Sequence, residues 1–141
     1  MEVKKLLDQG LIGDIKELSI TMLKKTNLAA NDPNNWRVDP SIAGGGYFYD
    51  LAPHQIDLVF YFLGNDLKSY SGASKNKAGM YAAEDFVEGN IEMASGIICK
   101  GLWDFSIKDQ EEKDEFLIIG TKGTIRFPVF GLFIELEMNG V

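Results

Sequence analysis

One long helical pattern, set among alternating segments, most constrains what this chain can fold into. Residues 50–63 (DLAPHQIDLVFYFL) have the most convincing helical pattern of the sequence, which closes at Gly64. Four side chains recur along it at i, i+4, i+7 and i+11, namely Asp50, His54, Asp57 and Tyr61. In a helix these four would lie in one narrow stripe. The segment therefore predicts a helix with one face that could carry chemistry.

Most other patterned segments alternate apolar and polar residues, which is typical of strands. Strands are expected at residues 15–25, 85–93, 97–105, 115–119, 124–127 and 132–138, with 66–74 as a weaker candidate. Short turns at Ser95-Gly96 and at residues 120–123 predict two antiparallel hairpins. A short helix over residues 2–8 should end at Gly10. We therefore expect an α+β fold, with a mostly antiparallel open sheet of about six strands and helices packed on one face.

Length, charge and cysteine content exclude several classes of protein. The 141 residues are the size of one domain, and residues 1–141 show no internal boundary. The net charge of −7 and the absence of a Lys/Arg cluster argue against a nucleic-acid surface. No apolar run reaches the roughly 18 residues of a membrane span. A single cysteine, Cys99, and a single histidine exclude a Cys/His zinc site, so no metal is predicted, and they fit a cytoplasmic location.

His54 is the residue on which a chemical interpretation depends. A histidine between Asp50 and Asp57 on one helix face suits proton transfer, because a carboxylate orients the ring and raises its pKa. The alternative is a structural histidine at a helix start, with Asp50 as N-cap and Asp57 as a solvated residue. A hydrolase would need a nucleophile beside the histidine, and no G-x-S-x-G elbow occurs.

Two further features near His54 leave alternatives open. If Asp50 is the N-cap, Pro53 lies in the first helical turn, whereas a helix beginning near Gly46 should be kinked at Pro53. The run from Gly44 to Gly46 is either a hinge or a place where the chain closely approaches another backbone or a ligand. It is not a phosphate-binding motif, because G-x-G-x-x-G and the P-loop pattern are both absent.

The stretch from Trp36 to Gly64 resembles a known family. It reads W-R-x-D-P…A-G-G-G-x-x-x-D-L-A-P-H-Q-I-D-L…L-G, and this combination resembles the C-terminal domain of the Gfo/Idh/MocA family of NAD(P)-dependent oxidoreductases. Segments at residues 10–18, 84–93 and 120–127 are also similar to that domain, so the resemblance covers nearly the whole chain. One departure is Ala52, where many relatives have glycine.

The resemblance implies roles for individual residues. His54 matches the catalytic histidine, which takes a proton from a substrate hydroxyl as hydride leaves the same carbon for the cofactor. Asp50 matches the aspartate one turn earlier, which positions the substrate or tunes the histidine. Trp36 and Arg37 match a loop near the substrate pocket, and Asp57 is the third candidate substrate-binding residue.

The resemblance also implies a second domain that this chain lacks. Family members carry an N-terminal Rossmann domain that binds NAD or NADP and supplies a lysine from a Glu-Lys-Pro motif, and neither that motif nor a dinucleotide fingerprint occurs here. The chain is therefore expected to be the substrate-binding and oligomerisation domain of a sugar or polyol dehydrogenase, inactive and without bound cofactor by itself. Its expected partners are its own Rossmann domain, the substrate and further copies bound through the sheet. The alternatives are a non-catalytic sugar-binding or regulatory module and a pure dimerisation domain in which His54 is structural.

Overall fold

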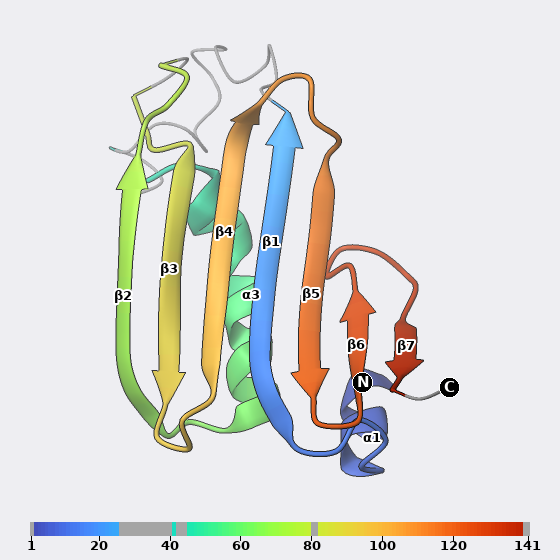
Figure 1. Cartoon of the computed structure of the whole chain (residues 1–141). Helices are drawn as coiled ribbons and strands as arrows, with labels where there is room; N and C mark the ends of the chain where they lie inside the picture. Colours follow the sequence, from blue (N-terminus) through green and yellow to red (C-terminus); the bar gives the residue numbers. More distant parts are fainter. Residues whose placement is uncertain (1, 26–40, 42–44, 80–81, 140–141) are drawn as a thin grey trace.

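The fold is one sheet with a long helix across one face (Figure 1). The computed structural model describes residues 2–25, 41, 45–79 and 82–139. Within these residues seven strands lie in the order β2-β3-β4-β1-β5-β6-β7. The strands are β1 (Ile15–Lys25), β2 (Leu67–Lys75), β3 (Phe86–Met93), β4 (Ile98–Ile107), β5 (Lys113–Gly120), β6 (Gly123–Phe127) and β7 (Glu135–Met138), and the helices are α1 (Glu2–Asp8) and α3 (Tyr47–Leu63). The α+β class with a helix on one face is confirmed.

Strand β1 lies at the centre of the sheet, and its alternation explains why. Leu18, Ile20 and Met22 are all buried, while the intervening side chains lie on the opposite face. A strand with one fully apolar face is stable only where neighbours on both sides and a covering layer exclude water from that face. Figure 1 shows α3 behind β4 and β1, where it supplies that layer.

The sheet is mixed, which corrects the prediction of a mostly antiparallel sheet of about six strands. β1 pairs in parallel with β4, from Glu17 opposite Ile98 to Lys25 opposite Ile107, and antiparallel with β5. The connection from β1 to β4 runs through α3, β2 and β3, which is long enough to return the chain in the same direction. A local pattern of alternation carries no information about a partner some 80 residues away, so the parallel pair was not foreseen.

Both predicted hairpins are confirmed. β3 and β4 are antiparallel neighbours, as are β5 and β6, with Phe116 opposite Phe127 in the second pair. The two phenyl rings stack at 5.1 Å, and Phe62 of α3 packs edge-on against Phe116 at 5.6 Å. Each buried phenyl contributes roughly 1.5–3 kcal/mol relative to exposure. These rings form the part of the core that fixes α3 over β5 and β6.

Candidate active site on helix α3

Helix α3 carries the predicted site and starts three residues earlier than Asp50. It runs from Tyr47 to Leu63 with Gly46 as N-cap, so Asp50 is not the N-cap. Pro53 therefore lies inside the helix rather than in its first turn. The helix ends as predicted at Gly64, whose φ of 84° is a left-handed conformation that glycine adopts without a steric penalty.

Helix α3 has one buried face and one exposed face, as the helical spacing predicts. The buried side chains recur at i, i+3, i+7 and i+10, namely Ala52, Gln55, Val59 and Phe62. His54, Asp57 and Tyr61 are exposed, which confirms three members of the predicted stripe. Asp50 lies one helical turn before His54 in the same continuous helix, while its side chain lies outside the described set. The polar stripe is therefore accessible to a small molecule.

Among the described side chains, Phe130 contacts the ring of His54. The two rings meet edge-on, with centroids 5.9 Å apart. Phe130 belongs to the loop between β6 and β7, and its backbone N–H donates to Asp114 Oδ2 at 2.8 Å. The Asp114 carboxylate also accepts the N–H of Val129 at 2.9 Å, so the loop is held against the start of β5. Sequence reasoning missed Phe130; the only signal was an aromatic residue inside a Pro128–Gly131 bend.

The structure describes only some of the predicted site residues. Asp57 is exposed, and among the side chains that the structure describes, no carboxylate forms an ion pair with His54. Trp36 and Arg37 lie outside the described residues, so their proximity to His54 stays a prediction. What the structure does establish is one accessible histidine on a helix whose opposite face is firmly packed.

A buried polar contact fixes α3 on the sheet. Gln55 is fully buried, and its Oε1 accepts the indole N–H of Trp103 on β4 at 2.6 Å. Phe48 packs edge-on against the same indole at 4.9 Å. The Nε2 group of Gln55 is buried without a hydrogen-bond partner. Because His54 precedes Gln55 directly, a contact that sets the rotation of α3 also sets the direction in which His54 points. Sequence reasoning did not single out either partner.

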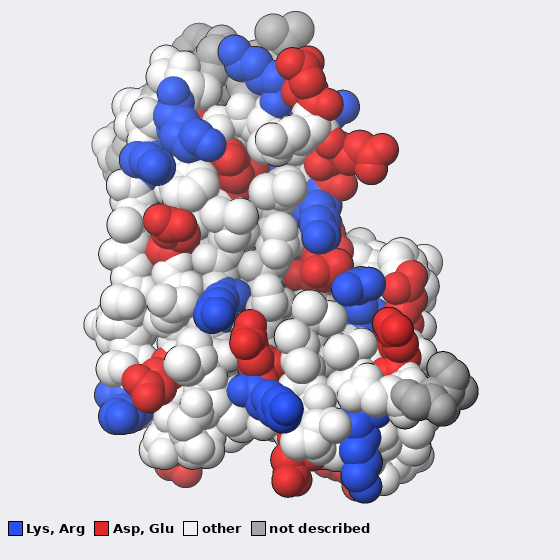
Figure 2. Space-filling model, in the orientation of Figure 1, with Lys and Arg blue, Asp and Glu red and all other residues white. Residues whose placement is uncertain are grey.

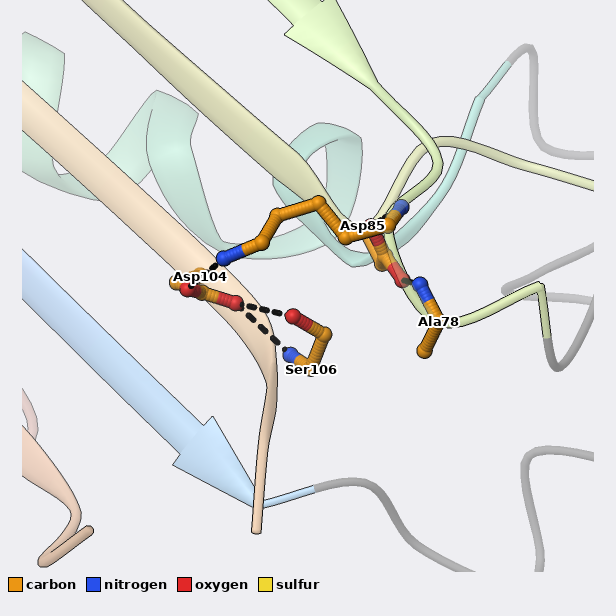
Figure 3. Close-up of polar contacts among 5 residues, drawn as sticks. Ala78, Asp85, Asp104 and Ser106 are labelled. Carbon is orange, nitrogen blue, oxygen red and sulfur yellow. Dashed lines mark hydrogen bonds and ion pairs between the residues drawn. The ribbon is translucent and has the colours of Figure 1, made fainter.

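A second polar cluster lies at the end of β4 (Figure 3). Asp85 is buried and accepts the backbone N–H groups of Lys77 and Ala78 at 2.7 and 2.8 Å. Asp104 accepts Lys77 Nζ at 3.0 Å and the Ser106 hydroxyl at 2.6 Å. Burial alone would raise the pKa of Asp104, but the hydrogen bonds from Ser106 and Lys77 and the charge of Lys77 lower it below its ordinary value. These groups are hydrogen-bond or ion-pair partners of one another, as expected of a structural cluster.

Cys99 is a core residue, as predicted, and not a nucleophile. Its side chain is buried on β4 and faces α3. Burial, with a smaller contribution from the charge of Glu17, raises the pKa of the thiol to about 12, so the reactive thiolate is disfavoured. Among the described residues, no group of three or more His, Cys, Asp or Glu side chains could hold a metal ion. No described helix is long and apolar enough to cross a membrane.

Comparison with known proteins agrees with this architecture. A sequence profile described as the GFO/IDH/MocA C-terminal domain matches residues 1–126. Oxidoreductase P35 of Formosa agariphila is 36% identical over 143 residues, which cover 100% of this chain and 43% of that protein. Both findings place the chain in one class, the sheet-containing C-terminal domains of oxidoreductases. The chain belongs to the Gfo/Idh/MocA family.

Solved structures with the same fold include dehydrogenases in complex with NADH. A levoglucosan dehydrogenase in complex with NADH and levoglucosan superposes with a TM-score of 0.74 at 28% identity, covering 89% of this chain and 36% of that one. The WlbA dehydrogenase of Bordetella pertussis, in complex with NADH and UDP-GlcNAcA, superposes with a TM-score of 0.79 at 23% identity, covering 99% and 43%. The second likeness concerns the fold alone. The chain spans less than half the length of each of these relatives.

Proposed function

We propose that this chain is the substrate-binding domain of a nicotinamide-dependent dehydrogenase that oxidises a hydroxyl of a sugar or polyol. The observation that carries the proposal is the placement of His54, exposed on α3 one turn after Asp50, on a helix whose other face is buried. A rigid helix presents a general base more exactly than a loop does, and neutral imidazole accepts a hydroxyl proton near neutral pH. The levoglucosan dehydrogenase that contains NADH together with levoglucosan supports the same class.

The nicotinamide cofactor would be held outside this chain, as the expectation of a separate Rossmann domain implies. The N-terminus of α3 is the natural place to test for a phosphate site, since free N–H groups there attract anions. In this chain the Gly46 N–H at that position already donates to the Glu84 carboxylate at 2.8 Å. That negative charge disfavours a second anion, so these residues do not fit the dinucleotide phosphates. We assign this domain only the binding of substrate and the removal of its proton.

An exposed apolar surface beside His54 supports the presence of a covering domain. Phe130, Leu132 and Phe133 are 51%, 103% and 59% exposed. They lie within residues 130–133 of the β6–β7 loop, in which Phe130 contacts the His54 ring. Contiguous exposed apolar side chains generally mark an interface. We infer that the cofactor domain packs here, which would exclude water from the space between His54 and the nicotinamide.

The substrate would then lie along the polar stripe of α3. Asp50 would orient the reacting hydroxyl or the His54 ring, and Asp57 would bind a neighbouring hydroxyl of the same molecule. We propose Trp36 and Arg37 as further substrate contacts. Carboxylates suit a polyol because each oxygen accepts hydrogen bonds from sugar hydroxyls.

The decisive experiment replaces His54 by alanine in the whole protein, with its cofactor domain present. Loss of a general base is expected to lower kcat by about 100-fold or more, with cofactor affinity nearly unchanged. Tyr61→Phe is the matched control, because Tyr61 is exposed on α3 one turn beyond Asp57 and so lies outside the part of the stripe, from Asp50 to Asp57, that is proposed to contact the substrate. Unchanged turnover in His54→Ala would contradict the enzyme proposal.

One observation favours a second candidate, a sugar-binding or regulatory module without turnover. Asp57, the expected carboxylate partner whose side chain the structure describes, forms no ion pair with His54. In that case His54→Ala would weaken sugar binding, measured by calorimetry, while the whole protein would reduce no NAD or NADP with any sugar. The two candidates thus differ in a single spectrophotometric assay of the unmodified protein.

We also propose that copies of the chain associate through the sheet. No described helix covers the face opposite α3 (Figure 1), and Figure 2 shows that this face mixes acidic, basic and uncharged side chains. Oppositely charged groups pair across strands there, with Arg126 Nε 3.0 Å from Glu115 and Lys100 Nζ 3.8 Å from Glu17. A surface of mixed charge can face its own copy about a two-fold axis without net repulsion.

A further inference from the structure

The start of helix α3 has no capping side chain of its own. Its N-cap is Gly46, and no side-chain hydrogen bond from the cap satisfies the first N–H groups. The acceptor comes instead from a residue 38 positions later, since the N–H of Gly46 donates to Glu84 Oε1 at 2.8 Å. A carboxylate at this end of a helix also interacts favourably with the helix dipole. Glu84 therefore serves as a cap supplied from outside the helix.

Two glycines allow Glu84 to approach so closely. A Cβ atom at Gly46 would collide with the backbone carbonyl oxygen of Glu84. A Cβ atom at Gly45 would lie 2.6 Å from Glu84 Oε1 and would also clash with the ring of Tyr49. At these two positions the glycine run is thus a site of close backbone approach, which is the second of the alternatives that the sequence left open. The third glycine, Gly44, lies outside the described residues.

The residue that follows Glu84 is held in place by several hydrogen bonds. The next residue, Asp85, is 1% exposed, and both of its carboxylate oxygens accept backbone N–H groups (Figure 3). The backbone of Asp85 is also held on both sides, because its N–H donates to Lys75 O at 3.2 Å and its C=O accepts Phe105 N–H at 2.8 Å. The backbone that carries Glu84 is therefore fixed to β2 and β4, the strands that contain Lys75 and Phe105.

The first turn of α3 needs such an external support. Pro53 has no N–H, so it cannot donate the i→i−4 hydrogen bond to the carbonyl of Tyr49. The turn from Tyr47 to Asp50 consequently shares fewer hydrogen bonds with the rest of the helix than an ordinary turn does. The rings of Tyr47 and Phe48 pack against Phe105 and Trp103 on β4, and the carboxylate of Glu84 holds the backbone N–H of Gly46.

We propose that Glu84 is a positioning residue for the candidate active site, which it serves by fixing the first turn of α3 and thereby the placement of Asp50 relative to His54. Its effect on turnover rests on the proposed dehydrogenase function; its effect on the helix does not. Displacing a catalytic constellation by about 1 Å is enough to lower turnover by roughly 100-fold. Glu84 touches neither His54 nor the reacting atoms in this arrangement, so it acts through the helix.

The test compares three variants of the whole protein. Glu84→Ala removes the acceptor, Glu84→Gln retains an oxygen that can accept the Gly46 N–H, and Glu88→Ala removes an exposed glutamate of β3 as a matched control. Hydrogen exchange of the backbone amides at residues 46–50 is measured together with kcat and KM. In Glu84→Ala we expect exchange about tenfold faster in this segment and kcat at least about tenfold lower, with the KM for cofactor unchanged. Glu84→Gln and Glu88→Ala should resemble the unmodified protein.

A fourth variant tests the same contact independently, in case Glu84→Ala does not fold. Gly46→Ala displaces the same contact from the helix side and should accelerate amide exchange in the same segment. Unchanged exchange in both Glu84→Ala and Gly46→Ala would overturn the proposal, as would faster exchange with unchanged kcat. If the unmodified protein oxidises no sugar or polyol, the dehydrogenase proposal fails, and with it the catalytic role of Glu84. The exchange data would then still decide whether Glu84 holds the helix.

Discussion

The contact between Gln55 and Trp103 gives the sharpest test of how α3 is held on the sheet. Both residues are almost completely buried, with 0% and 5% of their surfaces exposed, and one hydrogen bond of 2.6 Å joins them. A double-mutant cycle with Gln55→Met and Trp103→Phe isolates the energy of this contact. Methionine is similar to glutamine in length, and phenylalanine keeps an aromatic ring for Phe48 to pack against.

The expected loss of stability in each variant follows from the buried polar atoms that lose their hydrogen-bond partners. Trp103→Phe leaves the whole amide of Gln55 unpaired and removes part of a buried ring, so it should cost about 3–5 kcal/mol. Gln55→Met leaves the indole N–H without an acceptor, which should lower the free energy of unfolding by about 1–3 kcal/mol. The same substitution also removes the Nε2 group of Gln55, which already lacks a partner. Its net cost should therefore be only about 0–2 kcal/mol.

The double variant removes both polar groups together, so its cost should be smaller than the sum of the single costs. We expect a coupling energy of about 1–3 kcal/mol, measured by urea unfolding followed by circular dichroism and by tryptophan fluorescence where Trp103 is retained. Each kcal/mol should shift the melting temperature by about 2–4 °C in a domain of this size. Costs that add to within about 0.5 kcal/mol would refute the idea that the buried hydrogen bond fixes α3.

Two further predictions concern Cys99 and the sheet. Because the pKa of the Cys99 thiol is raised from 9.0 to about 12, alkylation of the folded chain at pH 8 should be about a thousandfold slower than in urea. Equal alkylation rates in both states would contradict the burial of the thiol. As the pH rises, the unfolded chain loses the thiol proton before the folded chain does, so the free energy of unfolding should fall above about pH 9. Cys99→Ala should weaken that fall. In sedimentation experiments the chain should associate, and Leu102→Glu on the open sheet face should produce monomers, whereas Gln110→Glu in the β4–β5 loop should not. A strict monomer at high concentration would argue against association through the sheet.

Much of the secondary structure was predictable because its causes are local. β1 has the predicted bounds, residues 15–25, and its apolar and polar residues alternate from Glu17 to Met22. The two hairpins follow from short turns between such segments, as at Gly96, whose φ is 93°. The strand predicted over residues 132–138 proved shorter and begins at Glu135, because strand bounds depend on a neighbour with which to pair.

Other features depended on residues far apart in the sequence. The sequence left two starts open for α3, one at Asp50 and one near Gly46, because the acceptor at the helix start is the carboxylate of Glu84, which no pattern near Asp50 reveals. The parallel pairing of β1 with β4 likewise joins segments about 80 residues apart. Phe130 meets His54 only because Asp114 holds the β6–β7 loop beside α3.

The sequence by itself determined that His54, Asp57 and Tyr61 share one face of a helix, because helical periodicity is a property of consecutive residues. It also determined the family, through the motif around the glycine run. Only the tertiary structure decided which way that face points, since the buried contact of Gln55 with Trp103 and the packing of Phe62 set the rotation of α3 over the sheet. It decided the role of Gly45 and Gly46 as well, because close approach to Glu84 exists only once the β2–β3 connection has folded against the helix start.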